Sequence, residues 1–353
     1  MEPAAAEPTP TPGNDPTSDP AVVAIVVSYN SAADLPSALH ALQAQRRVRL
    51  EIHVVDNASS DGSADLVRRD FPGVRLVANE RNVGFAAANN QALEGSNAPF
   101  YALVNPDTIA SPDAVAACVE ILRRDPRAGA AGPRLLHPDG SLQPSCHSFL
   151  GLRNLLGETF GIHRWFPRWR SLSSFYMPWF EHDRIAEVDW VTGAFLVVRG
   201  DVVRSVGPLD AAFFMYGEEM DWCYRLRRAG WRTVFLPVPT VVHVRGASSA
   251  SVAGSMFVEN LKGRVRFLRK HRGPVVAAAA RALIALSVMV RWLWKEVAAL
   301  FRGGGSAGGA RDAGSEAGEA GEALQSQEMF RAAARWVLRG LPLSPPRTRA
   351  GAS

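Results

Sequence analysis

Asp107 is the residue whose type and position in this sequence point most directly to chemistry. It follows a short apolar run, residues 100–104, and a proline at position 106. Because proline cannot donate to a β-ladder, a buried strand should end before it and leave Asp107 at the carboxyl edge of a parallel sheet, where open α/β folds bind ligands. A carboxylate there can hold a divalent cation through its oxygens, although the same residues could form an ordinary Asx turn.

Three further loops, each after a buried run, bring polar residues that could line a nucleotide site with Asp107. They are Ser28, Tyr29 and Asn30 in the first loop, Asp56 and Asn57 in the second, Arg81, Asn82 and Gly84 in the third, and Asn105 beside Asp107. Asp56 can accept a hydrogen bond from the N3–H of a pyrimidine, Tyr29 can lie against the base, and Arg81 can bind phosphate or a base carbonyl. Gly84 would let the backbone approach closely. Each loop alone could be a structural turn, but four in succession indicate a binding edge.

The second half of the chain adds three carboxylates and a histidine. Glu218, Glu219 and Asp221 follow an aromatic run that starts at Phe213. Acidic residues favour helix N-termini for electrostatic reasons alone. A carboxylate at the wall of an aromatic cavity, however, can have a raised pKa and act as a general base. His243 ends the last apolar run, and it is either a hydrogen-bonded core histidine or a metal ligand.

The elements that must position these residues alternate between strands and helices. Apolar runs predict strands at residues 21–28, 50–55, 74–78, 100–104 and 129–136, with helices at 34–45, 84–93 and 113–124. This alternation predicts an α/β fold of the Rossmann-like kind, with a mostly parallel, doubly wound sheet. Further on, the sequence indicates a strand at 188–198 broken at Gly193, a loop and then a helix at 213–230, and two short strands around Pro237 and Pro239.

The flanks of this core differ from it in composition. Residues 1–20 contain six prolines and predict a disordered tail. Residues 303–324 are rich in Gly and Ala, which predicts a flexible linker before an amphipathic helix and tail at 325–353. The aromatic and basic stretch 148–185 is either a surface insertion that packs on the core or a lid or acceptor loop.

Residues 251–302 combine a basic run with an apolar stretch. The longest window without a charge, residues 282–290, is too short to span a bilayer. Trp292 and Trp294 stand beside basic residues, as in helices that lie in a membrane interface. This stretch is therefore predicted to lie on a membrane surface or, alternatively, to pack on protein.

Composition argues against several classes of protein. The formal net charge of +5 is moderate, and we expect no nucleic-acid partner. The three cysteines form no CxxC pair, which argues against a zinc or disulfide framework and fits a reducing cytoplasm. The start of the chain lacks the features of a signal peptide. No predicted strand leads into a G-x-G-x-x-G or G-x-x-x-x-G-K-[ST] motif, which disfavours dinucleotide dehydrogenases and P-loop enzymes.

The order of seven motifs resembles that of the family-two inverting glycosyltransferases. The motifs are VSYN, VVDNASSDGS, NERNVGFAAANN, LVNPDT, DWVTGAFLVVRG, FMYGEEMDWCYRLRRAGW and HVRGASS. Within the family they are most similar to the bacterial rhamnosyltransferase branch. The resemblance covers residues 21–250, and it implies a GT-A domain there with a nucleotide-diphosphate sugar as donor.

The resemblance also implies roles for individual residues. Asp56 would read the pyrimidine, and Asp107 would be the metal-binding acid of a DxD-type motif whose first acidic place is held by Asn105. Glu219 would be the general base of the family's E-D-x-D pattern, where this chain has Glu for Asp. His243 would be an additional ligand of Mg²⁺ or Mn²⁺. The remaining roles are orientation of the base or acceptor by Glu218 and Asp221, nucleotide contact by Arg81, and contact with acceptor and diphosphate by Trp190, Thr192 and Gly193.

From the branch that it resembles, we expect the chain to transfer L-rhamnose from dTDP-rhamnose to a hydroxyl of a glycan or lipid-linked acceptor in cell-wall or polysaccharide synthesis. UDP-galactofuranose, UDP-GlcNAc and UDP-glucose stay open as donors. A sugar-phosphate nucleotidyltransferase is a first alternative, but it would need a Gly-rich basic loop after the first strand, and residues 28–31 (SYNS) do not form one. A non-catalytic glycan-binding module is a second alternative, but it would have no need of Asp107, Glu219 and His243 together. The expected location is cytoplasmic, peripheral at the inner face of the cell membrane.

Overall fold

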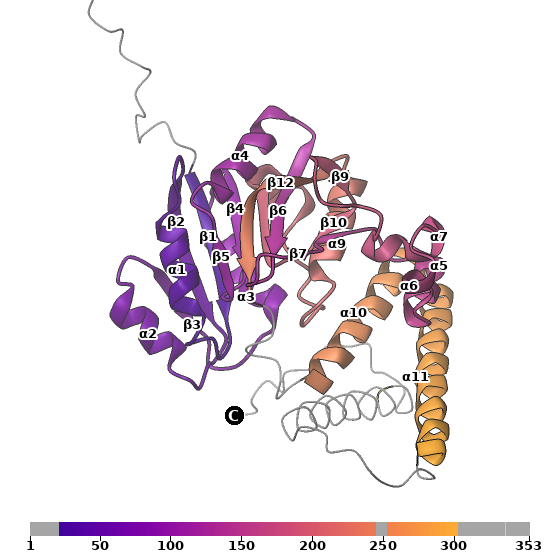
Figure 1. Ribbon diagram of the computed structural model, residues 1–353. Coiled ribbons are helices and arrows are strands. Elements are labelled where there is room, and N and C mark those ends of the chain that lie inside the picture. Colours follow the sequence, from indigo (N-terminus) through magenta and orange to yellow (C-terminus); the bar gives the residue numbers. More distant parts are fainter. Residues whose placement is uncertain (1–20, 245–252, 303–335, 337–353) are drawn as a thin grey trace, which may run out of the picture.

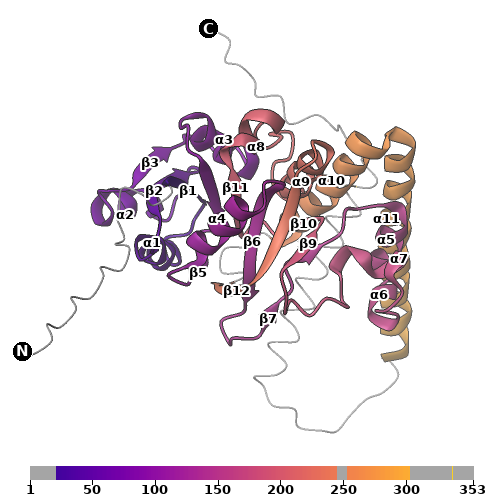
Figure 2. The same ribbon diagram turned by 90° about the horizontal axis from the view of Figure 1, so that it is seen from above.

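The computed structural model describes residues 21–244, 253–302 and 336 of the chain (Figure 1). The predicted N-terminal tail, the Gly/Ala linker and, apart from Trp336, the last amphipathic helix lie outside these residues. The described part consists of a central sheet with helices on its faces and a separate group of helices at one end (Figures 1 and 2).

Within the described residues, ten strands form one sheet and two more form a small second sheet. The order along the first sheet is β3 (Arg75–Ala78), β2 (Arg49–Asp56), β1 (Ala21–Ser28), β4 (Phe100–Val104), β11 (Phe195–Arg199), β6 (Ala128–Leu136), β12 (Arg232–His243) and β5 (Thr108–Ala110). Further pairs are β7 (Leu142–Gln143) with β6, β9 (Ala186–Val188) with β12, and β8 (Cys146–His147) with β10 (Trp190–Val191). Strand β11 runs against β4 and β6, whereas β1 to β4 are mutually parallel and β6 is parallel to β12. The predicted mostly parallel α/β sheet is confirmed.

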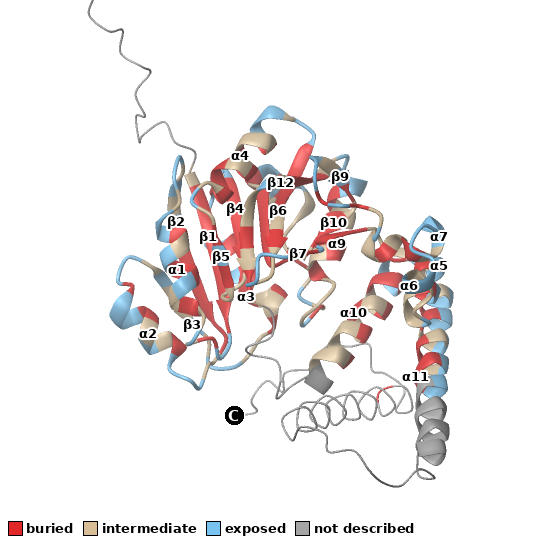
Figure 3. Cartoon of the chain, viewed as in Figure 1, coloured by how far each residue is buried: buried red, intermediate tan, exposed pale blue. Residues whose placement is uncertain are grey.

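Strand β1 shows why helices cover both faces of the sheet. Its sequence, AVVAIVVS, is buried from the second residue onward, and successive side chains point to opposite faces. Val22 and Val26 join one apolar cluster, and Val23 and Val27 join the other. Figure 3 shows the buried residues concentrated in the strands at the centre of the sheet. The first cluster includes side chains of α1 (Leu35–Gln43) and α4 (Ala114–Arg124), and the second those of α3 (Phe85–Glu94), α8 (Gly200–Val206) and α9 (Glu218–Arg228). Short helix α2 (Ser63–Asp70) joins β2 to β3.

The far edge of the sheet differs from the prediction in two ways. Strand β12 is a single strand with an irregular register between Leu236 and Thr240, and not two short strands. The prolines interrupt donation to the ladder only locally, and pairing with β6 resumes at Thr240. Strand β5, which the sequence did not indicate, pairs antiparallel with the end of β12 and places Thr108 opposite His243. This pairing brings the first and second halves of the chain together at one edge.

The stretch 148–185 folds into short helices that pack on the C-terminal helices. They are α5 (Leu152–Thr159), α6 (Ile162–Trp165), α7 (Arg170–Ser173) and the 3₁₀ helix η1 (Ser174–Tyr176), beside α10 (Ala253–Arg272) and α11 (Pro274–Arg302). Leu155 and Phe175 share a third apolar cluster with Phe267 and Ile284. In the described part of the chain, no helix is both long and apolar enough to cross a bilayer. The three cysteines, Cys118, Cys146 and Cys223, are buried free thiols.

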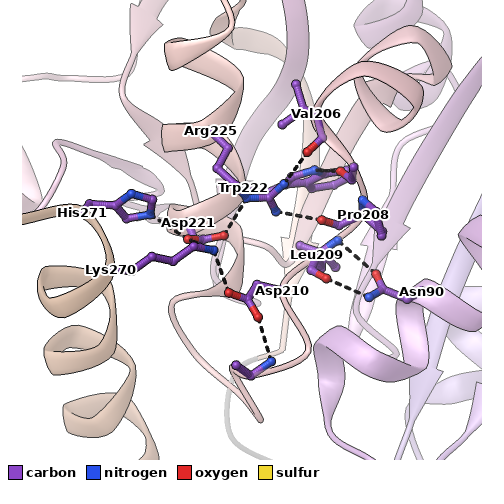
Figure 4. Close-up of polar contacts among 12 residues, drawn as sticks. Asn90, Val206, Pro208, Leu209, Asp210, Asp221, Trp222, Arg225, Lys270 and His271 are labelled. Carbon is purple, nitrogen blue, oxygen red and sulfur yellow. Dashed lines mark hydrogen bonds and ion pairs between the residues drawn. The ribbon is translucent and has the colours of Figure 1, made fainter. Parts of the chain in front are cut away.

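A buried ion network fixes helix α9 to helix α10 (Figure 4). The carboxylate of Asp221 accepts hydrogen bonds from Arg225 Nε at 2.8 Å, Lys270 Nζ at 2.8 Å and His271 Nε2 at 2.7 Å. Burial by itself raises the pKa of Asp221, but these bonds outweigh it and lower the pKa to about 2. Lys270 also contacts Asp210 at 2.6 Å. Asp221 therefore joins two helices, a structural role that was not predicted from the sequence.

Asp221→Asn should lower the free energy of unfolding by about 3 kcal/mol, because it leaves Arg225 and His271 without a charged partner inside the fold and Lys270 with Asp210 alone. The folded-state pKa lies below the ordinary value of 3.8, so the contribution of Asp221 is present above about pH 4 and is lost as the pH falls towards 2. Urea denaturation at pH 7 and pH 3 measures both effects. Asp65→Asn breaks only an exposed pair with Arg68 and should change stability by less than about 1 kcal/mol. Equal denaturation midpoints for wild type and Asp221→Asn would rule out the network as a source of stability.

Candidate active site

The carboxyl ends of β1 and β2 bring the first two predicted loops together. Ser28 and Asp56 are the last residues of these strands, lie opposite each other in the parallel register, and are buried. The hydroxyl of Ser28 has no hydrogen-bond partner among the described residues. Asp56 accepts hydrogen bonds from the backbone N–H of Ser59 at 2.9 Å and its hydroxyl at 2.6 Å. These two hydrogen bonds fix the orientation of the Asp56 side chain. Each carboxylate oxygen has two lone pairs, so Asp56 can still accept a hydrogen bond from a ligand.

Tyr29 and Asn30 form the outer rim of this edge. Asn30 has a positive φ of 51° and accepts a hydrogen bond from the backbone N–H of Ser60 at 2.8 Å. The Asn30 N–H in turn donates to Ser59 Oγ at 2.9 Å, which ties the first loop to the second. Tyr29 is exposed. Its ring is therefore accessible to a planar ligand such as a base.

The third loop is held by side-chain amides, and its glycine lies close to the loop before α9. Asn57 donates to the carbonyl of Gly84 at 3.3 Å, and Asn82 accepts from the Gly84 N–H at 2.9 Å. Gly84 has a φ of +90°, and a Cβ there would lie 2.6 Å from the carbonyl oxygen of Phe214. One close approach that needs a glycine is thus to the loop before α9. Arg81 is exposed at this edge of the sheet.

Asp107 and His243 lie side by side at the junction of β5 and β12. Asp107 Oδ1 is 3.3 Å from His243 Nε2, and the Asp107 carbonyl accepts from the Val244 N–H at 2.8 Å. His243 Nδ1 lies 2.8 Å from Gln143 Oε1, and Gln143 Nε2 lies 3.3 Å from His137 Nδ1. In the neutral tautomer that carries its proton on Nδ1, His243 donates to Gln143 Oε1, and the lone pair of Nε2 is directed at Asp107. Gln143 was not predicted from the sequence, because it stands in a two-residue strand with no motif around it.

The Asp107 and His243 pair fits a divalent cation. With the proton on Nδ1, two hydrogen-bond acceptors face each other, and a cation between them removes the repulsion. Among the described residues, no group of three or more His, Cys, Asp or Glu side chains could hold a metal. Sites that hold Mg²⁺ with one or two protein ligands and complete the shell with water and substrate phosphates are common. A third polar side chain, that of Asn105, lies beside the pair, with its Nδ2 at 3.5 Å from His243 Nε2.

Glu218 and Glu219 begin helix α9, and their surroundings differ. Glu218 is buried, and one of its carboxylate oxygens has no partner in the described part of the chain. Burial, together with the charge of Glu219, raises the pKa of Glu218 well above its ordinary value. Burial also raises the pKa of Glu219, but backbone N–H groups, including those of Gly217 and Gly193, oppose that rise. The pKa of Glu218 is therefore raised further than that of Glu219, which leaves Glu219 as the candidate proton acceptor of the two.

The backbone of Gly193 and Ala194 lies between Glu219 and the Asp107–His243 pair in the network of contacts. A Cβ on Gly193 would lie 3.6 Å from the side chain of Glu219. The next residue, Ala194, accepts a hydrogen bond at its carbonyl from the Asn105 N–H at 2.9 Å. Asn105 is two residues from Asp107, so Glu219 and the pair flank one short segment. That these residues form a common site stays a prediction, and the contacts of Gly193 and Ala194 are consistent with it.

Trp190 and Thr192 both contact His147, a residue that was not predicted from the sequence. Trp190 is buried, donates to the Ser148 carbonyl at 3.1 Å, and stacks on His147 with ring centroids 4.2 Å apart. His147 Nε2 lies 3.1 Å from Thr192 Oγ1. Trp190 is therefore held by Ser148 and His147, and its contact with the acceptor stays a prediction. The sequence signal for His147 was weak, because it lies alone beside the unassigned stretch 148–185.

Residues 23–185 match the family model described as Glycosyl transferase family 2. This match covers somewhat less than half of the chain, and it agrees with the resemblance that the sequence motifs indicate. It is 28% identical over 268 residues to the N-acetylglucosaminyl-diphospho-decaprenol L-rhamnosyltransferase of Mycobacterium tuberculosis, with 70% of this chain and 84% of the relative covered. A stretch of 86 residues is 37% identical to rhamnosyltransferase WbbL of Escherichia coli, covering 24% of this chain and 32% of that protein.

Solved structures show the same fold at low sequence identity. The mannosyltransferase PcManGT of Pyrobaculum calidifontis, in complex with GDP-Man and Mn²⁺, superimposes with a TM-score of 0.52 at 20% identity, covering 92% of this chain and 88% of that one. GalNAc-T7 with UDP, GalNAc and Mn²⁺ gives a TM-score of 0.51 at 15% identity, covering 71% of this chain and 48% of that one. These similarities confirm the predicted GT-A fold.

Proposed function

We propose that the protein transfers L-rhamnose from dTDP-rhamnose to a hydroxyl of a lipid-linked glycan, with inversion at the anomeric carbon, in cell-wall or polysaccharide synthesis. The observation that supports the reaction type is that Glu219 lies beside Gly193, whose neighbour Ala194 is hydrogen-bonded to Asn105, two residues from the paired Asp107. The choice of sugar and acceptor is supported by the named activity of the mycobacterial relative.

The reaction is a single in-line displacement. Glu219 removes the proton from an acceptor hydroxyl, and the resulting oxygen forms a bond to the anomeric carbon. The bond from that carbon to the diphosphate oxygen breaks on the opposite side through an oxocarbenium-like state, and the nucleoside diphosphate departs with the bonding electrons. The proton on Glu219 then passes to solvent, which restores the base.

Asp107 and His243 would hold a Mg²⁺ or Mn²⁺ ion beside the diphosphate of the donor. A bound cation supplies charge neutralisation for the departing diphosphate. Gln143 acts on the protein side, because its hydrogen bond fixes the ring orientation and tautomer of His243. Asp56 and Tyr29 would recognise and cover the pyrimidine, and Arg81 would lie near the nucleotide.

Release of nucleoside diphosphate across a donor panel tests the proposed function. The full chain is incubated with Mn²⁺, a polyprenyl-diphosphate-GlcNAc acceptor and, in turn, dTDP-rhamnose, UDP-galactofuranose, UDP-GlcNAc or UDP-glucose. We expect acceptor-dependent release of dTDP from dTDP-rhamnose and much slower release from the other three. Faster release from one of the UDP-sugars would show that this sugar nucleotide, and not dTDP-rhamnose, is the donor. Absence of acceptor-dependent release from every donor, with nucleotide binding intact, would contradict the proposed acceptor class.

The proposed location is peripheral, at the cytoplasmic face of the cell membrane. The relative's name places its substrate on a decaprenyl diphosphate, which is a membrane lipid carrier. An enzyme that uses such an acceptor must meet it at the bilayer surface, where the carrier's diphosphate lies. The chain therefore needs a face that contacts lipid.

A further inference from the structure

The helices that follow β8 end in an exposed tip of aromatic and basic side chains. Every residue from 164 to 171 is exposed, and Trp165, Phe166 and Trp169 have exposed fractions of 82%, 58% and 56%. Clustered exposure of large aromatic side chains is unusual on a protein surface and marks an interaction site. The tip, defined as residues 164–170, has the sequence RWFPRWR and contains three arginines and no acidic residue.

Helix α11 presents a second apolar surface beside the tip. Its exposed side chains Val275, Leu286 and Met289 lie on one side of the helix, whereas Ala280 and Ile284 on the other side are buried in the third core cluster. Helices α5, α6 and α7 lie beside α11 in both views, at the end of the molecule farthest from β3 (Figures 1 and 2). The tip and the exposed side of α11 therefore belong to one end of the protein.

We propose that this end docks on an anionic lipid bilayer, with the aromatic side chains of the tip in the interface and its arginines at the headgroups. Tryptophan prefers the membrane–water interface because its ring is apolar and its N–H is polar. Arginines next to such rings are attracted by the negative surface potential of anionic lipid. A protein partner would not account for a surface that combines clustered rings with charge of one sign only as directly as an anionic bilayer does.

Docking in this way would set a hollow of the protein against the membrane. His163 and Arg164 line a hollow of about 710 Å³ whose other walls include Met177 and Phe180. If the acceptor is lipid-linked, which rests on the proposed function, its lipid carrier would enter this hollow from the membrane, beside the tip. Membrane binding itself needs neither donor nor acceptor, so it can be measured independently of the transferase reaction.

Sedimentation with vesicles tests the proposal on the full chain. We expect binding to vesicles of equal parts phosphatidylcholine and phosphatidylglycerol, weaker binding to phosphatidylcholine alone, and loss of binding as salt screens the charges. Trp165→Ser with Phe166→Ser, and separately Arg164→Gln with Arg168→Gln, should each weaken binding to the anionic vesicles by about tenfold or more. Circular dichroism establishes that each variant is folded.

The matched control removes two arginines at the opposite end of the molecule. Arg68→Gln with Arg69→Gln changes the net charge equally on α2, and it should leave vesicle binding at the wild-type level. Equal loss in this control would mean that net charge alone governs binding, which overturns the assignment to the tip. Failure of the wild type to sediment with anionic vesicles overturns it as well. A dimer that dissociates in the aromatic variant, with vesicle binding unchanged, would show that the tip is a protein interface instead.

Discussion

Glu219→Gln should fold, bind nucleoside diphosphate as the wild type does, and lose about a hundred- to ten-thousandfold in turnover, which is the usual contribution of a general base. The amide keeps the shape of the side chain beside Gly193 but cannot accept the proton of the acceptor hydroxyl. The variant and the wild type are compared at saturating donor and acceptor, with nucleotide affinity measured by calorimetry. Loss of turnover with retained affinity separates a catalytic defect from a binding defect.

Two further measurements make this test specific. Glu187→Gln changes an exposed glutamate paired with Arg232 on β9 and β12, and its turnover should equal that of the wild type. Because burial raises the pKa of Glu219, the base loses its proton-accepting form at a higher pH than an exposed glutamate would. The wild-type rate should therefore decline on the acid side from a pH above the ordinary glutamate range. Near wild-type turnover in Glu219→Gln would remove Glu219 from the role of base.

Asp107→Ala should abolish the gain in nucleotide affinity that Mn²⁺ provides. We expect Mn²⁺ to strengthen the binding of dTDP or UDP to the wild type and to leave the variant's affinity unchanged, because His243 alone is a weak site. Gln143→Leu should weaken Mn²⁺ affinity by about ten- to a hundredfold, as is typical when a hydrogen bond that orients a metal-binding histidine is lost. Calorimetric titration of nucleotide with and without Mn²⁺ measures both.

The order of the three proteins identifies the source of the effect. Wild type, Gln143→Leu and Asp107→Ala should show successively smaller responses to Mn²⁺, while their affinity for nucleotide without metal stays similar. If Asp107→Ala responds to Mn²⁺ as the wild type does, the cation is held elsewhere. If Gln143→Leu is indistinguishable from the wild type, the contact between Gln143 and His243 only packs the core.

The site could be predicted from sequence where local chemistry determines the structure. The apolar run before Asp107, the proline that ends it, and the similar runs before Ser28 and Asp56 place their polar residues at the same edge, because parallel strands share a direction. Glu218 and Glu219 also lie where the aromatic run and the helix start indicated, at the beginning of α9.

Contacts between residues distant in sequence could not be predicted in this way. The pairing of β5 with β12, the hydrogen bond from His243 to Gln143, and the stacking of His147 on Trp190 each depend on tertiary packing that leaves no local pattern. The partners of Asp221 also could not be predicted from the local sequence. Its place in an acidic motif suggested a role beside Glu219, but its partners Lys270 and His271 come from a helix about fifty residues further on.

Crystals grown with Mn²⁺ and dTDP test most directly the claim that two halves of the chain share one cation. Diffraction data collected at the manganese absorption edge locate the ion without reference to the protein atoms. We predict one strong anomalous peak within coordination distance of Asp107 Oδ1 and His243 Nε2, beside the diphosphate and facing Glu219 across the segment at Gly193. A manganese peak that contacts the diphosphate but neither of these two side chains would contradict the account.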